Sequence, residues 1–202
     1  MLYYFDLFGV AVFAVTGALM AGRKSMDLFG VSVIGVVTAL GGGTLRDVIL
    51  AHYPVTWIGD ETYILVAVIA ALGTVLWVRM TQPIHEFGLL LADAFGLAVF
   101  TVSGTQVALQ LDVPISTAVI MGVMTGVAGG VMRDVICNEI PLIFRQEIYA
   151  SACILGALVH VGLVQMHSSA EMAAVIAMCV VFSVRMAALH WKWTLPRFHL
   201  LD

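Results

Sequence analysis

The chain has 202 residues, of which 61% are hydrophobic and only 11% are charged. A soluble domain carries about 25% charged residues, so this chain has too few of them to cover its surface in water. We therefore predict an integral membrane protein. The formal net charge of −4 says little about partners, and no cluster of basic residues indicates nucleic acid.

Long apolar runs predict an all-α membrane fold with seven transmembrane helices. A transmembrane helix needs about 20 predominantly apolar residues. Short polar connections separate seven such spans, at residues 4–22, 28–50, 62–77, 89–109, 116–136, 148–164 and 170–189. No connection is long enough to divide the chain, so we expect a single transmembrane domain over residues 1–202.

The basic residues predict the orientation of the chain in the membrane. Seven spans place the two termini on opposite sides. Most basic residues fall on or towards the C-terminal side, namely Arg23, Lys24, Arg79, Arg133, Arg145, Arg185, Lys192 and Arg197. Arg46 falls towards the other side. Under the positive-inside rule, the C-terminus is cytoplasmic and the N-terminus lies outside.

Two segments of the chain recur at a spacing of 87 residues, as from Asp6 to Asp93. Residues 6–21 read DLFGVAVFAVTGALMA and residues 93–108 read DAFGLAVFTVSGTQVA. Residues 35–49 read GVVTALGGGTLRDVI and residues 122–136 read GVMTGVAGGVMRDVI, and the same spacing joins Pro54 to Pro141 without a gap. We therefore predict a duplication, with repeat 1 at about 4–80, repeat 2 at about 89–165 and a seventh helix at about 170–189. Because each repeat has three spans, the two repeats would be inverted in the membrane.

Glycine runs interrupt the second and fifth predicted spans at matching positions. The glycines are Gly41, Gly42 and Gly43 in the first copy and Gly129 and Gly130 in the second. Each glycine costs about 1 kcal/mol of helix propensity, so we expect both helices to loosen or bend there. Freed backbone carbonyls could then contact a cation. Close packing between helices is the alternative interpretation.

An Arg–Asp pair follows each glycine run, as Arg46 with Asp47 and Arg133 with Asp134. Charges at membrane depth are expensive unless they are paired or face water. We expect crossed pairing between the repeats, Arg46 with Asp134 and Arg133 with Asp47, if the helix ends approach. Otherwise each pair serves its own vestibule. The pairs either hold the fold together, or shape the electric field of a pore or form its gate.

Further polar residues recur at matching positions of the two repeats. Asp6 and Asp93 open the first and fourth predicted spans, where they either cap the helices or attract cations to a pore mouth. Four hydroxyl residues are candidates for the polar wall of a narrow pore: Thr16, Thr38, Ser103 and Thr125. No residues show metal-ligand spacing, and no catalytic motif is present, so we do not expect an enzyme.

With these motifs and this layout, the sequence resembles a bacterial member of the TRIC family, the trimeric intracellular cation channels. The same group is also filed as a duplicated glycine-transporter domain. The resemblance implies a homotrimer in the bacterial inner membrane. Each protomer would have its own pore between the repeats, past the bent second and fifth helices, and would conduct monovalent cations, potassium or sodium. The resemblance implies no other cofactor and no soluble partner, and it leaves open whether lipid is bound.

Two other classes of function remain open on the sequence. A secondary transporter of a small zwitterion such as glycine would also use broken helices in inverted repeats. A helix N-terminus with Arg46 or Arg133 could hold the carboxylate of the zwitterion, and Asp47 or Asp134 could hold its ammonium group. A structural or lipid-binding membrane module without transport is the third class.

Overall fold

The computed structural model describes residues 2–81, 86–145 and 148–193, so Arg197 of the orientation prediction lies outside the described residues. The described part of the chain forms nine helices and no strand. The helices are α1 (Leu2–Arg23), α2 (Leu28–Ile49), α3 (Thr56–Gly59), α4 (Thr62–Met80), α5 (Glu86–Gln110), α6 (Ile115–Ile136), α7 (Leu142–Arg145), α8 (Ala150–Gln165) and α9 (Ala170–Trp191).

Six described helices are long and apolar enough to cross a membrane: α1, α2, α4, α5, α6 and α9. The helix α8 is also apolar, but it has 16 residues, fewer than the roughly 20 that a full crossing needs. A helix of the structure therefore lies at each predicted span, and one of the seven is short. The connections after the two Arg–Asp pairs contain the short helices α3 and α7, which the hydropathy pattern did not predict.

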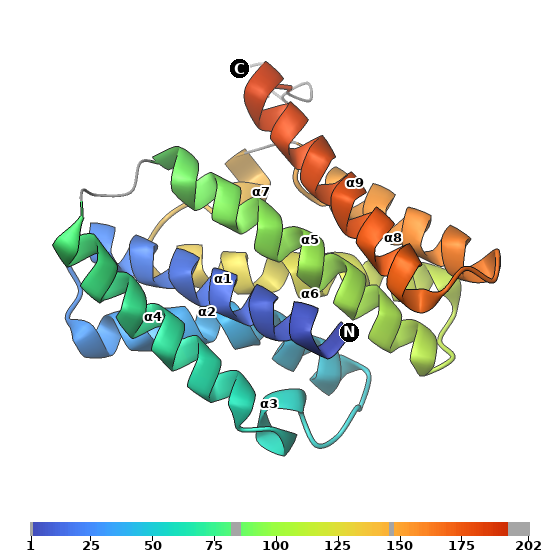
Figure 1. Ribbon diagram of the computed structural model, residues 1–202, viewed down its shortest axis with the longest axis horizontal. Coiled ribbons are helices and arrows are strands. Elements are labelled where there is room, and N and C mark those ends of the chain that lie inside the picture. The colour runs from blue at the N-terminus through green and yellow to red at the C-terminus, as the bar shows by residue number, and fades with distance from the viewer. Residues whose placement is uncertain (1, 82–85, 146–147, 194–202) are drawn as a thin grey trace, which may run out of the picture.

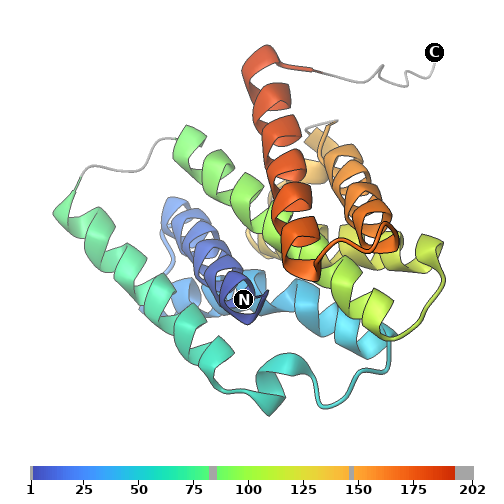
Figure 2. The same ribbon diagram turned by 45° about the vertical axis from the view of Figure 1, so that its right-hand side comes forward.

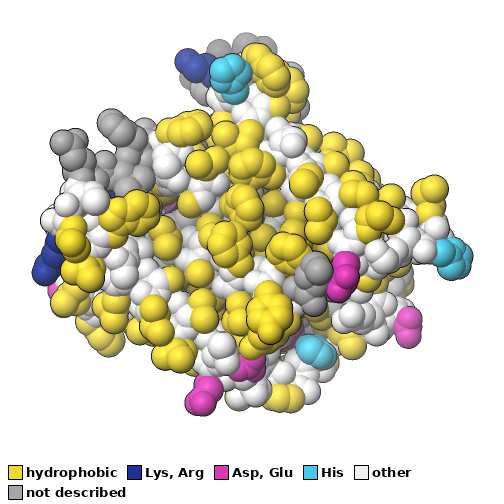
Figure 3. All heavy atoms as spheres, in the orientation of Figure 1, with side chains coloured by type: hydrophobic (Ala, Val, Ile, Leu, Met, Phe, Trp, Pro, Cys, Tyr) yellow, Lys and Arg dark blue, Asp and Glu magenta, His cyan; other side chains and the backbone are white. Residues whose placement is uncertain are grey.

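The helices form one bundle in which α1 and α5 occupy central positions. The helix α1 packs against α2, α4 and α5, whereas α5 packs against α6, α8 and α9. Figures 1 and 2 show α5 running between α4 on one side and α8 and α9 on the other. Hydrophobic side chains spread across the face in Figure 3, and few charged side chains appear on it. This distribution fits a protein whose lateral surface contacts lipid.

The glycine runs lie inside continuous helices, so neither helix is interrupted there. At Gly42, an added Cβ would lie 2.1 Å from the carbonyl oxygen of Thr125. At the matching Gly129, it would lie 2.2 Å from the carbonyl oxygen of Thr38. These two glycines therefore let the backbones of α2 and α6 touch where the helices cross. Tight tertiary packing outweighs the low helix propensity, as the alternative interpretation expected.

Candidate functional site

A polar cavity of about 180 Å³ lies among α1, α3, α4, α5, α9 and the end of α2. Eight polar side chains line it: Tyr3, Asp6, Arg46, Thr56, Tyr63, Ser103, Gln106 and Gln110. One oxygen of the half-buried Asp6 accepts a hydrogen bond from the Ser103 hydroxyl (2.7 Å), and the other accepts one from the Tyr63 hydroxyl (3.0 Å). The cavity therefore has a carboxylate held by two neutral donors in its wall.

Arg46, which lines this cavity, is bonded to Asp47, the next residue in the chain. The Nε atom of Arg46 donates to Asp47 (2.8 Å), and its Nη2 atom donates to the Thr56 hydroxyl (3.1 Å). The other oxygen of Asp47 accepts hydrogen bonds from the backbone N–H and the hydroxyl of Thr56. Both charged side chains are buried. They fasten the start of α3 to the end of α2.

A second and fully buried network surrounds Arg133 in the other half of the bundle. The Nε atom of Arg133 donates to Asp134 (2.8 Å). Its Nη1 atom donates to both Asp93 (2.9 Å) and the Thr16 hydroxyl (3.1 Å). Asp93 also accepts a hydrogen bond from the Tyr149 hydroxyl (2.8 Å). One guanidinium group thus joins three helices through two carboxylates and a hydroxyl.

The predicted crossed pairing of the Arg–Asp pairs is wrong. Each arginine instead bonds to the aspartate that follows it in the chain. Each aspartate has a second oxygen bonded to the connection after its helix, through Thr56 in one half and the backbone N–H of Leu142 in the other. These local bonds hold each carboxylate in its own half of the bundle, away from the other arginine.

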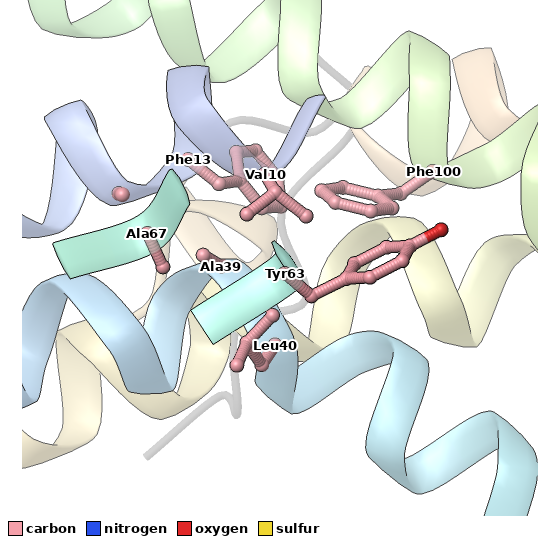
Figure 4. Close-up of a cluster of buried hydrophobic side chains, with 8 residues drawn as sticks. Val10, Phe13, Ala39, Leu40, Tyr63, Ala67 and Phe100 are labelled. Atoms are coloured by element: carbon pink, nitrogen blue, oxygen red, sulfur yellow. The ribbon is translucent and has the colours of Figure 1, made fainter. Parts of the chain in front are cut away.

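A pair of aromatic rings lies between the cavity and the Arg133 network. Phe13 and Phe100 are both buried, and their ring centroids are 5.1 Å apart. Along α1, Phe13 comes seven residues after Asp6 and three before Thr16, and Phe100 holds the matching position in α5. Seven helical residues span about 10 Å, so along α1 Phe13 lies at a level between Asp6 and Thr16. Figure 4 shows the cluster around them, with Val10, Ala39 and Leu40.

The predicted hydroxyls fall into two groups. Ser103 and Thr16 enter the polar networks through Asp6 and Arg133. Thr38 and Thr125 instead donate to carbonyl oxygens of their own helices, at 2.6 Å in both cases. They also face Gly17 and Gly104, where an added Cβ would lie 2.6 and 2.4 Å from their hydroxyl oxygens. The second pair therefore makes packing contacts.

The two predicted capping aspartates lie inside their helices. The helix α1 begins at Leu2 and α5 at Glu86, so Asp6 and Asp93 are more than a turn beyond the helix start in each case. Their side chains accept hydrogen bonds from Ser103, Tyr63, Arg133 and Tyr149 instead of from helix N–H groups. The capping interpretation is wrong because each aspartate lies at least four residues inside its helix and bonds to side chains of other helices.

Two tyrosines of the networks were missed because the repeats were aligned without a gap. Tyr63 donates to Asp6 and Tyr149 to Asp93, yet the tyrosines are 86 residues apart while the aspartates are 87 apart. A one-residue deletion after Pro141 restores the match. Phe13 and Phe100 occupy matching positions in the two similar segments, and this match is the sequence signal that could have identified them.

Arg185 of α9 is a further buried charge that the repeat could not indicate, because α9 follows both copies. Its guanidinium carbon lies 4.7 Å from the centroid of the Tyr149 ring. Its Nη1 atom donates to the carbonyl oxygen of Ile148 at 3.3 Å. A cation over an aromatic face is favourable, more so when it is desolvated. Arg185 therefore packs over the face of the Tyr149 ring, whose hydroxyl bonds to Asp93.

The fold and its buried polar centre define a helical membrane protein of the channel or transporter class. A family model described as glycine transporter matches residues 3–79 and 90–165. The inner membrane protein YadS of Escherichia coli K12, assigned to the group UPF0126, is 45% identical over 201 residues, covering 99% of this chain and 97% of YadS. A UPF0126 membrane protein of Vibrio cholerae is 44% identical over 200 residues, covering 99% of this chain and 84% of that protein.

Solved structures identify the family more closely. The TRIC trimeric intracellular cation channel orthologue from Rhodobacter sphaeroides superposes with a TM-score of 0.90 at 38% identity, covering 95% of this chain and 98% of that one. A structure described under the conductance of TRIC cation channels gives 0.88 at 35% identity, covering 98% of both chains. The chain is a bacterial member of the TRIC family, which confirms the family resemblance. These matches are to channel proteins, in agreement with the expectation that the chain is not an enzyme.

Proposed function

We propose that the protein is a passive channel for monovalent cations, potassium in particular, with one path through each protomer. The path begins at the polar cavity beside Asp6, passes between Phe13 and Phe100, and continues past Arg133. It runs along α1 and α5, because Gly42 and Gly129 pack closely against the backbones of Thr125 and Thr38 in the facing helix. The names of the TRIC structures, which describe cation channels, support this assignment.

The observation that carries the proposal is the carboxylate of Asp6 in the cavity wall. Ser103 and Tyr63 bond to it as neutral donors, and Arg46 is paired with Asp47. The negative charge of Asp6 is therefore available to attract a cation into the cavity. Rings and clusters of acidic side chains favour cations in channels through the same electrostatic effect.

The described conformation corresponds to a closed path in this proposal. The rings of Phe13 and Phe100 are in contact, and Arg133 bridges Asp93 and Thr16 beyond them. An apolar constriction excludes water and hence ions, because an ion must keep its hydration shell or exchange it for polar ligands. Conduction would require the rings to separate and the Arg133 side chain to move aside.

The arrangement in the membrane is also part of the proposal. The two halves of the chain would be inverted repeats, with the N-terminus outside and the C-terminus in the cytoplasm. Asp6 and Arg46 would then lie on the outer side, and Arg133 on the inner side. The protein would form a homotrimer in the inner membrane, as the name of the Rhodobacter channel states for that protein.

A transporter of a small zwitterion is the second candidate, because the cavity is lined by both a carboxylate and a guanidinium group, Asp6 and Arg46. The ligands first considered for this function, Asp47 and Asp134, are bonded to their own arginines. Asp6 would therefore hold the ammonium group. Arg46 would have to exchange a bond with Thr56 for the carboxylate of the zwitterion.

Flux into liposomes tests the proposal. Purified protein is reconstituted with a potassium gradient, the membrane potential is followed with a voltage-sensitive dye, and radiolabelled glycine is offered in parallel. We expect a potassium diffusion potential without saturable glycine uptake, and a smaller potassium flux in Asp6→Asn. Saturable glycine uptake without potassium leak would favour the transporter. A folded Asp6→Asn variant with wild-type flux would remove Asp6 from the path.

A further inference from the structure

A second, larger cavity opens at the other end of α1, away from the proposed path. It has a volume of about 420 Å³ and lies among the end of α1, the start of α2 and the end of α4. No residue in its lining also lines the cavity beside Asp6. Its walls are largely apolar, and include Ala18, Leu19, Met26, Val31, Val75 and Val78.

Two arginines stand in the lining of this groove. Arg23 is the last residue of α1, and Arg79 is in the last turn of α4, so both lie at the same end of the bundle. Both side chains are exposed, and no ion pair joins either of them to an acidic side chain within residues 2–81, 86–145 and 148–193. Two guanidinium groups are therefore available to a ligand.

Among the described residues that line the groove, Asp27 is the acidic one, and it has a structural role. Its carboxylate accepts a hydrogen bond from the backbone N–H of Gly30 (2.8 Å) and caps the start of α2. The helix N-terminus offsets part of its negative charge. The groove thus combines apolar walls with a positive rim.

The space around Gly22, a residue that lines the groove, also indicates that the groove is open. A Cβ added at this lining residue would meet no atom within 4 Å. At most other glycines in the helices of this protein, an added Cβ would meet a neighbouring side chain or backbone atom at 3.4 Å or less. A space of this size with apolar walls, beside transmembrane helices, can take an acyl chain.

We propose that this groove binds an anionic phospholipid, with an acyl chain along its walls and the phosphate group between Arg23 and Arg79. Arginine binds phosphate oxygens through paired N–H donors, which gives such a site strength and geometric selectivity. Basic pockets between transmembrane helices are a recurring form of anionic lipid site. The excess of two guanidinium groups over one capped carboxylate selects an anionic headgroup over a zwitterionic one. The proposal does not depend on the channel function.

Native mass spectrometry of the purified, delipidated full-length protein tests the site. Phosphatidylglycerol and phosphatidylcholine with identical acyl chains are titrated separately, and bound lipids are counted. We expect the wild-type protein to prefer phosphatidylglycerol. Each of Arg23→Gln and Arg79→Gln should weaken that binding about fivefold, and the double variant about 30-fold. The Arg23→Lys/Arg79→Lys variant should retain most of the preference.

A filled groove provides the second arm of the test. Gly22→Trp should displace the lipid without a clash, because its side chain enters open space. Gly73→Trp is the matched control, since an added Cβ at this α4 residue also meets nothing within 4 Å and the residue does not line the groove. Equal affinity for the two lipids, or an unchanged preference in the double glutamine variant, would overturn the proposal. A change of oligomeric state in Gly22→Trp alone would assign the groove to a contact between protomers instead.

Discussion

The Nη1 atom of Arg133 lies 2.9 Å from the carboxylate of Asp93, whereas the matching arginine, Arg46, bonds to Thr56. The two halves of the bundle thus use the same residue types in two arrangements. In one half, Arg133 bonds to both Asp93 and Thr16. In the other half, Ser103 matches Thr16 and donates directly to Asp6, which matches Asp93. The second arrangement leaves the cavity beside Asp6. Two similar sequence segments therefore surround one open and one filled polar region.

Removing the charge of Asp93 should destabilise the protein far more than removing that of Asp6. Asp93 is fully buried and bonded to Arg133, and breaking a buried pair by removing one partner costs about 3–5 kcal/mol. Asp6 is half-buried with neutral partners, so Asp6→Asn should cost about 1 kcal/mol. Unfolding free energies of Asp93→Asn and Asp6→Asn in the same detergent measure the difference. Equal losses would contradict the distinction between the two vestibules.

Phe100→Ala should increase the resting leak of potassium in liposomes, because it removes half of the proposed constriction. It should also cost about 3–5 kcal/mol of stability, as large-to-small changes in a packed core do. Phe13→Leu is the milder variant, which keeps most of the volume and should raise the leak less. Phe8→Ala is the control, since Phe8 pairs with Phe95 but is 51% exposed. If folded Phe100→Ala leaks no more than Phe8→Ala, the ring pair does not close the path.

Gly42→Ala and Gly129→Ala should both weaken the crossing of α2 and α6. The new methyl group would lie 2.1–2.2 Å from a carbonyl oxygen of the facing helix, so the helices must move apart. Gly43→Ala is the neighbouring control, because its Cβ would meet only the Arg46 side chain, at 3.8 Å. Because alanine has a better helix propensity than glycine, Gly43→Ala should stabilise the protein by up to about 1 kcal/mol. Thermal unfolding of the three variants checks the order, and destabilisation of Gly43→Ala to the level of Gly42→Ala would be the contrary result.

The stability of the protein should depend on Glu139 at low pH. Lys24 donates a hydrogen bond to Glu139 at 2.7 Å, and Arg145 also pairs with Glu139. These bonds lower the pKa of the Glu139 carboxyl group, and the bond from Lys24 has the larger effect. Because the folded-state pKa lies below the unfolded one, the pairs stabilise the protein above the ordinary glutamate range. That contribution is lost as the pH falls through the lowered pKa. Melting temperatures of the wild type and Glu139→Gln should therefore converge in acid. A constant difference down to pH 3 would contradict this linkage.

The hydropathy and motifs of the sequence determined the membrane class, the places of the helices and the family. This is possible because the backbone of a spanning segment in lipid must bond within itself, so a long apolar run already specifies a helix. The repeated motifs also located several residues of the buried networks, among them Asp6, Asp93, Arg133 and Ser103. The hydropathy and the motifs of a segment carry this information because they can be read without knowing which other segment packs against it.

Only the tertiary structure decided which groups meet. The partner of each arginine depends on how closely α2, α6 and their connections approach, and the glycines set that approach through backbone contact between helices. The contact of Phe13 with Phe100 and the position of Arg185 over Tyr149 depend on helices that are distant in the chain. Arg46 and Arg133 have different second partners, Thr56 and Asp93, because different helices surround them. Identical neighbours in sequence give each arginine the same first bond, and the surrounding helices determine the second.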